Sequence, residues 1–328
     1  MPVLLIVIIG IALVFDFLNG FHDSSNIVAT MISSRAMPPR LALAMTAVAE
    51  FSGPFLFGVA VATTIGSEIV DPAAISSAVI IAALASAILW NLFTWYFGFP
   101  SSTSHALIGG LIGAVGVAEG LSTIRLAGLE KVLIALFLSP ILGLVLGYLV
   151  LKVIYFLARG AGPSANTFFK RGQWVTSLAL ALSHGTNDAQ KTMGIIAMAM
   201  VTTGFSTTFY VPWWVIALSA GAIALGTALG GWRLIKTLGG KFYKIRPVHA
   251  FGSQLTSASI ILGAALLGGP VSTTQVVSSS IMGAGAADRL SKVRWTVARD
   301  LAVAWLLTIP ISALVAAGLY LVVHLFVK

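Results

Sequence analysis

The chain has little charge and no cysteine, and both shortages exclude whole classes of protein. Only 9% of its 328 residues are charged and 58% are hydrophobic, whereas soluble domains carry about 25% charged residues. A water-soluble domain is therefore excluded. Without cysteine there are no disulfides, thiolate metal sites or cysteine nucleophiles. No Gly-x-Ser-x-Gly, Ser-x-x-Lys or His-Glu-x-x-His pattern occurs either, so an enzyme would lack a candidate nucleophile.

Long apolar runs make up most of the chain, and a membrane-spanning helix needs about 20 such residues. In the first half the runs cover 3–19 with 24–34, 41–65, 73–99, 101–117 and 132–157. In the second half they cover 174–183 with 189–203, 213–232, 248–267, 271–287 and 297–327. These runs lack a strand-like alternation of apolar and polar residues. We therefore predict an all-α, multi-pass membrane protein.

Two polar motifs recur at about half the chain length. Gly20–Asp23 (GFHD) aligns with Gly185–Asp188 (GTND) at an offset of 165 residues, and 100–105 (PSSTSH) aligns with 270–275 (PVSTTQ) at an offset of 170. Each match is weak alone, but the two occur in the same order. The spacing predicts an N-terminal repeat over 1–158, a short basic cytoplasmic linker over 159–172 and a C-terminal repeat over 173–328.

The formal net charge of +9 comes from basic residues gathered between the apolar runs. This distribution is typical of cytoplasmic loops rather than of a nucleic-acid-binding surface. The segments 68–71 and 205–210 have no Lys or Arg and are placed outside. Corresponding helices of the two halves then cross the membrane in opposite directions, which predicts inverted repeats with the substrate site near the midplane. The predicted inside loops carry Arg35 and Arg40, Arg159, Lys170 and Arg171, Arg233 and Lys236, and Arg289 and Lys292.

Two kinds of interruption are expected in the membrane. The run 174–203 would be about 45 Å long as one helix, against about 30 Å of hydrocarbon, so we predict broken helices at Gly185–Asp188 and at its counterpart Gly20–Asp23. The turns at Pro100 and Pro270 are short, uncharged and flanked by apolar residues. We predict that they are the tips of re-entrant hairpins, with loops outside the membrane as the alternative.

Several charged residues lie inside apolar stretches, where each costs roughly 2.5–3.5 kcal/mol. The functional interpretation is an ion- or proton-binding site in the membrane, and the structural one is an ion pair between Asp188 and Lys191. Glu50 is either a proton carrier or the partner of Lys191 or a histidine. Asp16 is assigned to a membrane face or to this polar group. The candidate coupling residues are Asp23, Asp188, Lys191, Glu50 and His22, with Asn26 and Asn187 beside them.

Hydroxyl residues follow both prolines and open apolar helices. Hydroxyls and free N–H groups at a helix N-terminus can bind an oxyanion, since the positive end of the helix dipole faces it. Ordinary N-capping is the alternative; two symmetric copies favour a shared anion site. The candidate phosphate ligands are Ser102, Thr103, Ser104, Ser272, Thr273 and Thr274, with Gln190 of the second polar motif.

At these motifs the sequence resembles the inorganic phosphate transporter (PiT) family, in the form of its bacterial low-affinity permeases. The likeness rests on Phe21–Thr30, on His184–Gly194 and on the two Pro-Ser/Val-Ser-Thr stretches. It implies phosphate uptake driven by a cation gradient, and in sodium-coupled members sodium held at the positions of Asp23, Asn26, Asn187 and Asp188. Lys191 stands where such members have Asn. Because an ammonium repels a nearby cation, we expect proton coupling.

The expected protein is thus a phosphate:proton symporter of the cytoplasmic membrane with alternating access. Sodium coupling, sulfate or a metal–phosphate complex are the nearest alternatives, and a phosphate channel or sensor belongs to a different class. No cofactor and no nucleic acid are expected. Inorganic phosphate and membrane lipid are the predicted partners, and a homodimer is compatible with the sequence.

Overall fold

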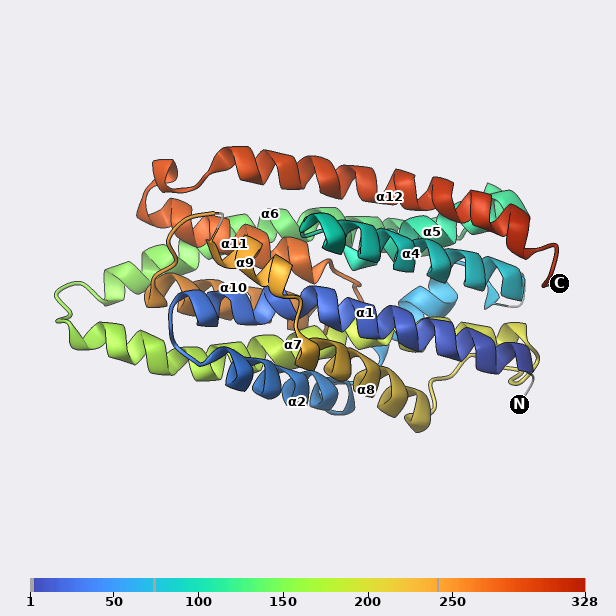
Figure 1. Ribbon diagram of the computed structural model, residues 1–328, viewed down its shortest axis with the longest axis horizontal. Helices are drawn as coiled ribbons and strands as arrows, with labels where there is room; N and C mark the ends of the chain where they lie inside the picture. Colours follow the sequence, from blue (N-terminus) through green and yellow to red (C-terminus); the bar gives the residue numbers. More distant parts are fainter. Residues whose placement is uncertain (1–2, 73–74, 241, 328) are drawn as a thin grey trace.

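The computed structural model describes residues 3–72, 75–240 and 242–327, and its helices lie side by side in an elongated bundle (Figure 1). The first half contains α1 (Val3–Ser33), α2 (Pro39–Phe57), the short α3 (Ala60–Thr63), a π-helical turn (Thr64–Glu68), α4 (Ser77–Phe97), α5 (Thr103–Ala118) and α6 (Leu126–Leu157). The second half contains α7 (Ser164–Thr202), α8 (Trp213–Leu229), α9 (Trp232–Gly240), α10 (Pro247–Leu266), α11 (Thr273–Asp288) and α12 (Trp295–Val323). Because α7 begins at Ser164, part of the predicted linker is helical.

Five of the described helices are long and apolar enough to cross a membrane, namely α1, α2, α4, α6 and α12. Helices α6 and α12 bury little of their apolar windows, and side chains such as Leu306 and Leu314 are exposed. An exposed apolar surface of this extent suits lipid rather than water. The chain is a multi-pass membrane protein. The α1–α2, α6–α7 and α11–α12 connections lie at one end of the bundle, on the left of Figure 1.

The predicted breaks at Gly20–Asp23 and Gly185–Asp188 are wrong, because α1 and α7 run through both motifs as continuous helices. Neither helix contains proline. The hydroxyls of Ser183 and Thr186 donate back to the carbonyls of Ala179 and Leu182, which keeps these polar residues inside the helical pattern. The excess length of α7, about 58 Å at 1.5 Å per residue, is accommodated by its exposed basic start near Arg171.

The helical breaks occur instead in the second helix of each half. Helix α2 ends at Gly58, with φ of +83°, before α3 begins. Helix α8 ends at Gly230, with φ of +72°, and α9 leaves it at an angle of 71°. A positive φ strains residues with a Cβ, so glycine is what permits both breaks. The sequence signal for these breaks was a lone glycine and a Gly-Gly pair.

Two helical hairpins enter the bundle from opposite ends, and their tips meet in the middle (Figure 1). One is α4–α5 with the turn at Pro100, and the other is α10–α11 with the turn at Pro270. The Oγ of Ser104 donates to the carbonyl oxygen of Val271 over 3.0 Å, which joins the two tips directly. Ser102 and Ser272 are fully or almost fully buried. These tips fit re-entrant hairpins and exclude solvent-exposed loops.

Glycines permit the closest helix crossings, and the two halves use them in the same way. A Cβ on Gly20 would lie 2.0 Å from the Ile223 carbonyl oxygen where α1 crosses α8. A Cβ on Gly185 would lie 2.2 Å from the Glu50 carbonyl oxygen where α2 crosses α7. Such distances are sterically impossible for any residue but glycine. The two glycines are those aligned at the offset of 165 residues, as a repeat requires.

Candidate functional site

The polar residues singled out in the sequence gather where α1 and α7 pass the two hairpin tips. Asp23, His184, Asp188 and Lys191 are all buried. Two apolar clusters, one built around Leu5 to Phe15 of α1 and one around Ile27 to Met31, flank this belt. The site is therefore a closed polar layer between two apolar layers, where electrostatic interactions are much stronger than in water.

The carboxylate of Asp23 accepts hydrogen bonds from hydroxyls of both hairpins. Thr274 donates to Oδ1 over 3.0 Å and Thr273 to Oδ2 over 3.2 Å. Thr103, at the start of α5, approaches Oδ2 to 3.5 Å. Thr273 is also 3.1 Å from Oδ2 of Asp188. Asp23 thus contacts three of the hydroxyls that were predicted from the sequence to bind phosphate.

Both hairpin tips are N-capped by the serine two residues after the proline of their motif, Ser102 and Ser272. Ser102 accepts from the backbone N–H of His105 over 3.1 Å and Ser272 from that of Gln275 over 3.4 Å. For these two residues the structure bears out the N-capping alternative. The starts of α5 and α11 nevertheless face one common region, so their dipoles add to the positive potential there.

Lys191 connects Asp188 to both hairpins. Its Nζ donates to Oδ1 of Asp188 over 2.6 Å, to Oγ of Ser104 over 2.5 Å and to the carbonyl oxygen of Val271 over 3.2 Å. The structural interpretation, an Asp188–Lys191 ion pair, is thus confirmed, and the pair lies inside the functional cluster. The two interpretations are compatible here.

Two histidines complete the charged cluster. Nδ1 of His22 lies 2.7 Å from Oδ1 of Asp23. His184 places Nδ1 2.8 Å from Oε1 of Glu50, and Nε2 3.4 Å from Oδ2 of Asp188. Glu50 is therefore the partner of a histidine, not of Lys191. Three carboxylates face one ammonium and two imidazoles, so the charge of the cluster depends on how many protons the histidines and acids hold.

The predicted amides lie in different places. Nδ2 of Asn26 donates to Oγ1 of Thr274 over 3.0 Å, beside Asp23, and Asn187 donates to the Gly269 carbonyl oxygen at the α10–α11 turn over 3.1 Å. Gln190 is turned away, because its amide bonds the carbonyl oxygen of Gly58 and the backbone N–H of Val61 at the start of α3. The structure does not bring Gln190 to the hydroxyls.

His184 is the central residue that sequence reasoning left out of the candidate site. Its signal was available, because it precedes Asp188 by four residues and so shares a helix face with it. One oxygen of Asp23, one oxygen of Asp188 and one ring nitrogen of His184 lie within 4.8 Å of one another. These are ligand types that can hold a small cation. Within the described residues, this trio is the candidate for sodium or another metal ion.

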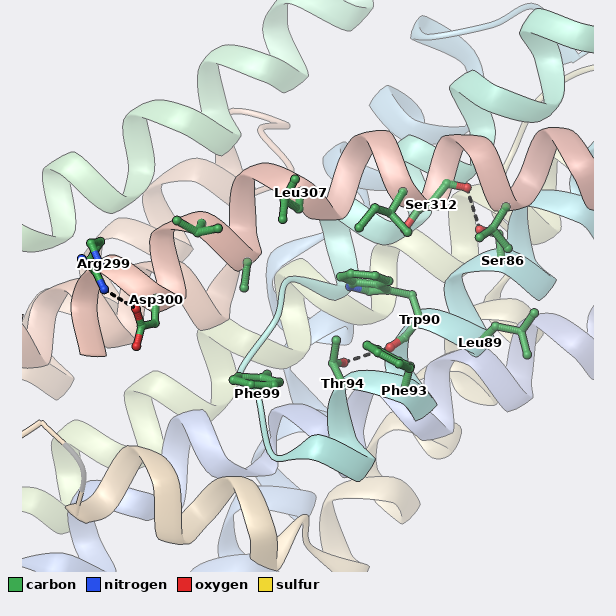
Figure 2. Close-up of a pocket in the computed structure, with 14 residues that line it drawn as sticks. Ser86, Leu89, Trp90, Phe93, Thr94, Phe99, Arg299, Asp300, Leu307 and Ser312 are labelled. Atoms are coloured by element: carbon green, nitrogen blue, oxygen red, sulfur yellow. Dashed lines mark hydrogen bonds and ion pairs between the residues drawn. The ribbon is translucent and has the colours of Figure 1, made fainter. Parts of the chain in front are cut away.

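A cavity of about 1130 Å³ lies elsewhere, between α4 and α12. Figure 2 shows it lined by Trp90, Phe93 and Leu307, with a hydrogen bond of 2.7 Å from Ser86 to the carbonyl oxygen of Ser312 at one edge. None of its lining residues belongs to the cluster around Asp23. Its walls are mostly aromatic and aliphatic, and its one basic lining residue, Arg299, lies 3.4 Å from the carboxylate of Asp300, so it is poorly suited to an oxyanion.

Comparison with known proteins gives the family of the chain. Residues 19–316 match the phosphate transporter family. A probable low-affinity inorganic phosphate transporter of Bacillus subtilis (strain 168) is 45% identical over 98% of both chains, and one of Rhizobium meliloti (strain 1021) is 44% identical over 97% of this chain and 96% of that one.

A solved structure of a sodium-dependent phosphate transporter is similar in fold. Its TM-score is 0.89 over 99% of this chain and 100% of that one, at 24% identity. Identity at this level shows the fold alone, and the family follows from the profile and the bacterial relatives. The chain belongs to the phosphate transporter family.

Proposed function

We propose that this protein takes up inorganic phosphate across the cytoplasmic membrane by proton symport. Access to the site would alternate between the two membrane faces. One observation carries the proposal. Three threonine hydroxyls from both hairpins, donors of the kind that bind phosphate oxygens, converge on the carboxylate of Asp23. The same two hairpins enter from opposite ends (Figure 1), so movement of either one would open the site toward one side.

The charge of the site favours a co-transported cation. Phosphate brings negative charge to a buried site that already holds Asp23 and Asp188. Two like unit charges 4 Å apart repel by about 4 kcal/mol at an effective dielectric constant of 20. A proton that binds to the carboxylate of Asp23 or Asp188 neutralises one of the two like charges and so removes this repulsion. Phosphate binding is therefore expected to be coupled to proton binding.

Protonation of Asp23 would also release hydrogen-bond donors. As a carboxylate, Asp23 accepts from Thr273 and Thr274. As a carboxylic acid it accepts less strongly and gains one donor of its own. The hydroxyls would then turn to the phosphate oxygens, and Asp23 would join them as a donor. Phosphate and proton would thus stabilise each other's binding, as symport requires.

Lys191 supports the proton as the coupling ion. Its ammonium contacts a carboxylate, a hydroxyl and a backbone carbonyl. These are the oxygen ligands that a hard metal cation prefers, and here a fixed side-chain charge uses them. The alternative, sodium at Asp23, His184 and Asp188, would place a second cation within the same group of atoms.

The site also favours phosphate over sulfate. Near neutral pH phosphate keeps at least one O–H, whereas sulfate has none. An ionised acceptor such as Asp188 can bind the phosphate O–H and would repel sulfate. Discrimination therefore rests on an acid at the site, whereas hydroxyl groups alone accept both anions.

The test is uptake of labelled phosphate into proteoliposomes with imposed gradients. A proton gradient, acidic outside and without sodium, is expected to drive accumulation, and excess sulfate is expected to compete poorly. The matched control is Asp300→Asn, which removes an exposed acid of α12 and is expected to behave as the natural protein. Uptake that requires sodium and ignores the proton gradient would overturn proton symport, and downhill flux without accumulation would indicate a channel.

A further inference from the structure

A second buried acid lies on α1 outside the cluster just described. Asp16 is 0% exposed, and neither of its carboxylate oxygens has a hydrogen-bond partner among the described residues. The polar side chains of Asn19, one turn further along α1, and Thr192 of α7 face it. Both are buried, and the amide atoms of Asn19 and the hydroxyl of Thr192 also have no partner there. Three buried polar groups thus meet at one position, and among the described residues none of them has a hydrogen-bond partner outside this trio.

This position lies on the face of α1 that also carries the phosphate site. Asp16, Asn19 and Asp23 follow one another at intervals of three and four residues, which places them on one side of a helix. Asp16 is seven residues from Asp23, about 10 Å along the axis. It lies toward the N-terminal end of α1, opposite to the basic α6–α7 connection (Figure 1). On the predicted orientation this is the outer side of the site.

The charged groups that act on Asp16 belong to α7. They are Asp188 and Lys191, which already pair with each other. Helices α4 and α8 also pack against α1 and contain no Asp, Glu, Lys, Arg or His. Hydrogen bonds join α1 to α11 at Asp23 and to α10 at Thr30, and Gly239 of α9 packs against Ser33. Glu50 of α2 faces His184. Among the described residues, Asp16 therefore has no cationic side chain paired with it alone, since Lys191 already pairs with Asp188.

We propose that Asp16, Asn19 and Thr192 form an outer proton-binding site through which the coupling proton reaches Asp23, an inference that rests on the proton symport proposed above. When Asp16 is protonated, its O–H can donate to the amide oxygen of Asn19 or to the hydroxyl of Thr192. When it is ionised, the amide N–H and the hydroxyl can donate to it instead. An amide and a hydroxyl both donate and accept, so this trio satisfies either state with small rotations.

The chemistry of the trio favours a proton over a metal ion. Hard cations are held by about six or more oxygens. Here the Asp16 carboxylate provides two oxygens, and the Asn19 amide and the Thr192 hydroxyl provide one each. The backbone carbonyls of α1 and α7 accept hydrogen bonds within their own helices. A proton needs one acceptor only. Because the two acids lie about 10 Å apart along α1, the proton would pass from Asp16 to Asp23 through intervening water, without change of oxidation state, and the ionised Asp16 is then free to accept the next proton from outside.

The test compares Asp16→Asn with the natural protein in two transport modes. The introduced amide imitates the protonated acid but cannot release a proton. We expect proton-driven accumulation to fall at least tenfold, while exchange of internal for external phosphate at equal pH stays within about twofold, because exchange needs no net proton movement. Asp300→Asn, an exposed acid on α12, is the matched control and is expected to change neither mode.

A second variant keeps the inference testable if Asp16→Asn does not fold. Thr192→Val preserves the side-chain volume and removes the hydroxyl. We expect this variant to exchange phosphate normally. The external proton concentration that gives half-maximal accumulation is expected to differ at least threefold from that of the natural protein. Unchanged dependence on proton concentration in Thr192→Val, or unchanged accumulation in Asp16→Asn, overturns the outer site.

The remaining outcomes separate this inference from the proposed function. If a sodium gradient and not a proton gradient drives uptake by the natural protein, the proposed proton symport is wrong, whatever Asp16→Asn shows. If the natural protein is proton-driven and Asp16→Asn loses exchange as well as accumulation in a folded state, Asp16 belongs to the phosphate site and the outer site is wrong. If Asp16→Asn changes sodium dependence alone, the trio binds sodium and the proton assignment is wrong.

Discussion

The two halves of the site use one geometry with different charges. In the first half Nδ2 of Asn26 donates to the second hydroxyl of α11, that of Thr274. In the second half Nζ of Lys191 donates to the second hydroxyl of α5, that of Ser104. Asn26 and Lys191 are related by the offset of 165 residues, and Ser104 and Thr274 by the offset of 170. The same contact is therefore neutral on one side and ionic on the other.

This difference shows how a symmetric frame can hold an asymmetric site. Corresponding helices and hairpins of the two halves fix where the helices cross and where the hairpin tips meet. Single side chains then decide which half carries fixed positive charge. Asp188 has an ammonium 2.6 Å away, whereas Asp23 has hydroxyls and the ring of His22. The first half is thus expected to bind and release the proton, and the second half to keep its charge.

The largest effect is expected when the acid of the first half is neutralised. Asp23→Asn cannot bind or release a proton, and it weakens charged hydrogen bonds worth about 1.5–3 kcal/mol each. Coupled uptake in proteoliposomes is expected to fall by roughly a hundredfold or more, while the protein still inserts and purifies. Asp188→Asn should destabilise the protein as well, since Lys191 loses its partner. Normal uptake by Asp23→Asn would remove this residue from the site.

The next change makes the two halves alike. Lys191→Asn leaves Asp188 without its buried partner, a loss that typically costs about 3–5 kcal/mol, so thermal stability in detergent should fall markedly. Added sodium is expected to restore part of it, because a cation can then bind at Asp188. Arg171→Asn, an exposed change on the same helix, is the control. Equal stability of the two variants would contradict the proposed role of Lys191.

A smaller effect is expected at the residue that has no counterpart in the second half. Glu50→Gln removes the charge 2.8 Å from His184 and keeps the shape. Loss of one charged contact worth about 1.5 kcal/mol should lower the initial uptake rate about tenfold. Glu68→Gln breaks a half-exposed pair with Lys131, which is worth little, and serves as control. Indistinguishable rates for both variants would show that Glu50 has no functional role.

The smallest effect is expected at the two N-caps, and it should be slightly larger at Ser102, because the Ser102 hydroxyl also contacts Nδ1 of His105. Ser102→Ala and Ser272→Ala each remove one cap, which costs about 1 kcal/mol. Uptake should change less than in the preceding variants, because the hydroxyls that contact Asp23 remain. Thermal unfolding of the two variants measures the difference. A large loss of phosphate affinity in only one of them would assign that serine to the ligand shell.

Sequence reasoning reached the helical class and the two hairpins, and it named most of the polar residues that the fold gathers into one cluster, for physical reasons that can be named. Charges and hydroxyls in apolar runs must find partners, so Asp23 and Asp188 were expected in a buried ion or proton site and Thr273 and Thr274 in a buried anion site. The positions of the breaks were missed, because hydroxyls that bond within a helix let α1 and α7 continue. Gln190 was wrongly assigned to the phosphate ligands. Only the fold brings its amide against the free backbone N–H groups at the start of α3. His184 was undervalued, because its partner Glu50 lies on another helix.

The burial of α7 has a consequence for how the protein is made. From Ser183 to Met200 this helix is almost wholly enclosed, and it carries His184, Asp188 and Lys191. Such a segment is costly to transfer into lipid alone. The first half leaves the ribosome earlier and supplies Glu50, Asp23 and Ser104, the partners that offset this cost. Biogenesis of the second half is thus expected to depend on the first, and a gene fragment starting near Ser164 should yield a protein that fails to insert.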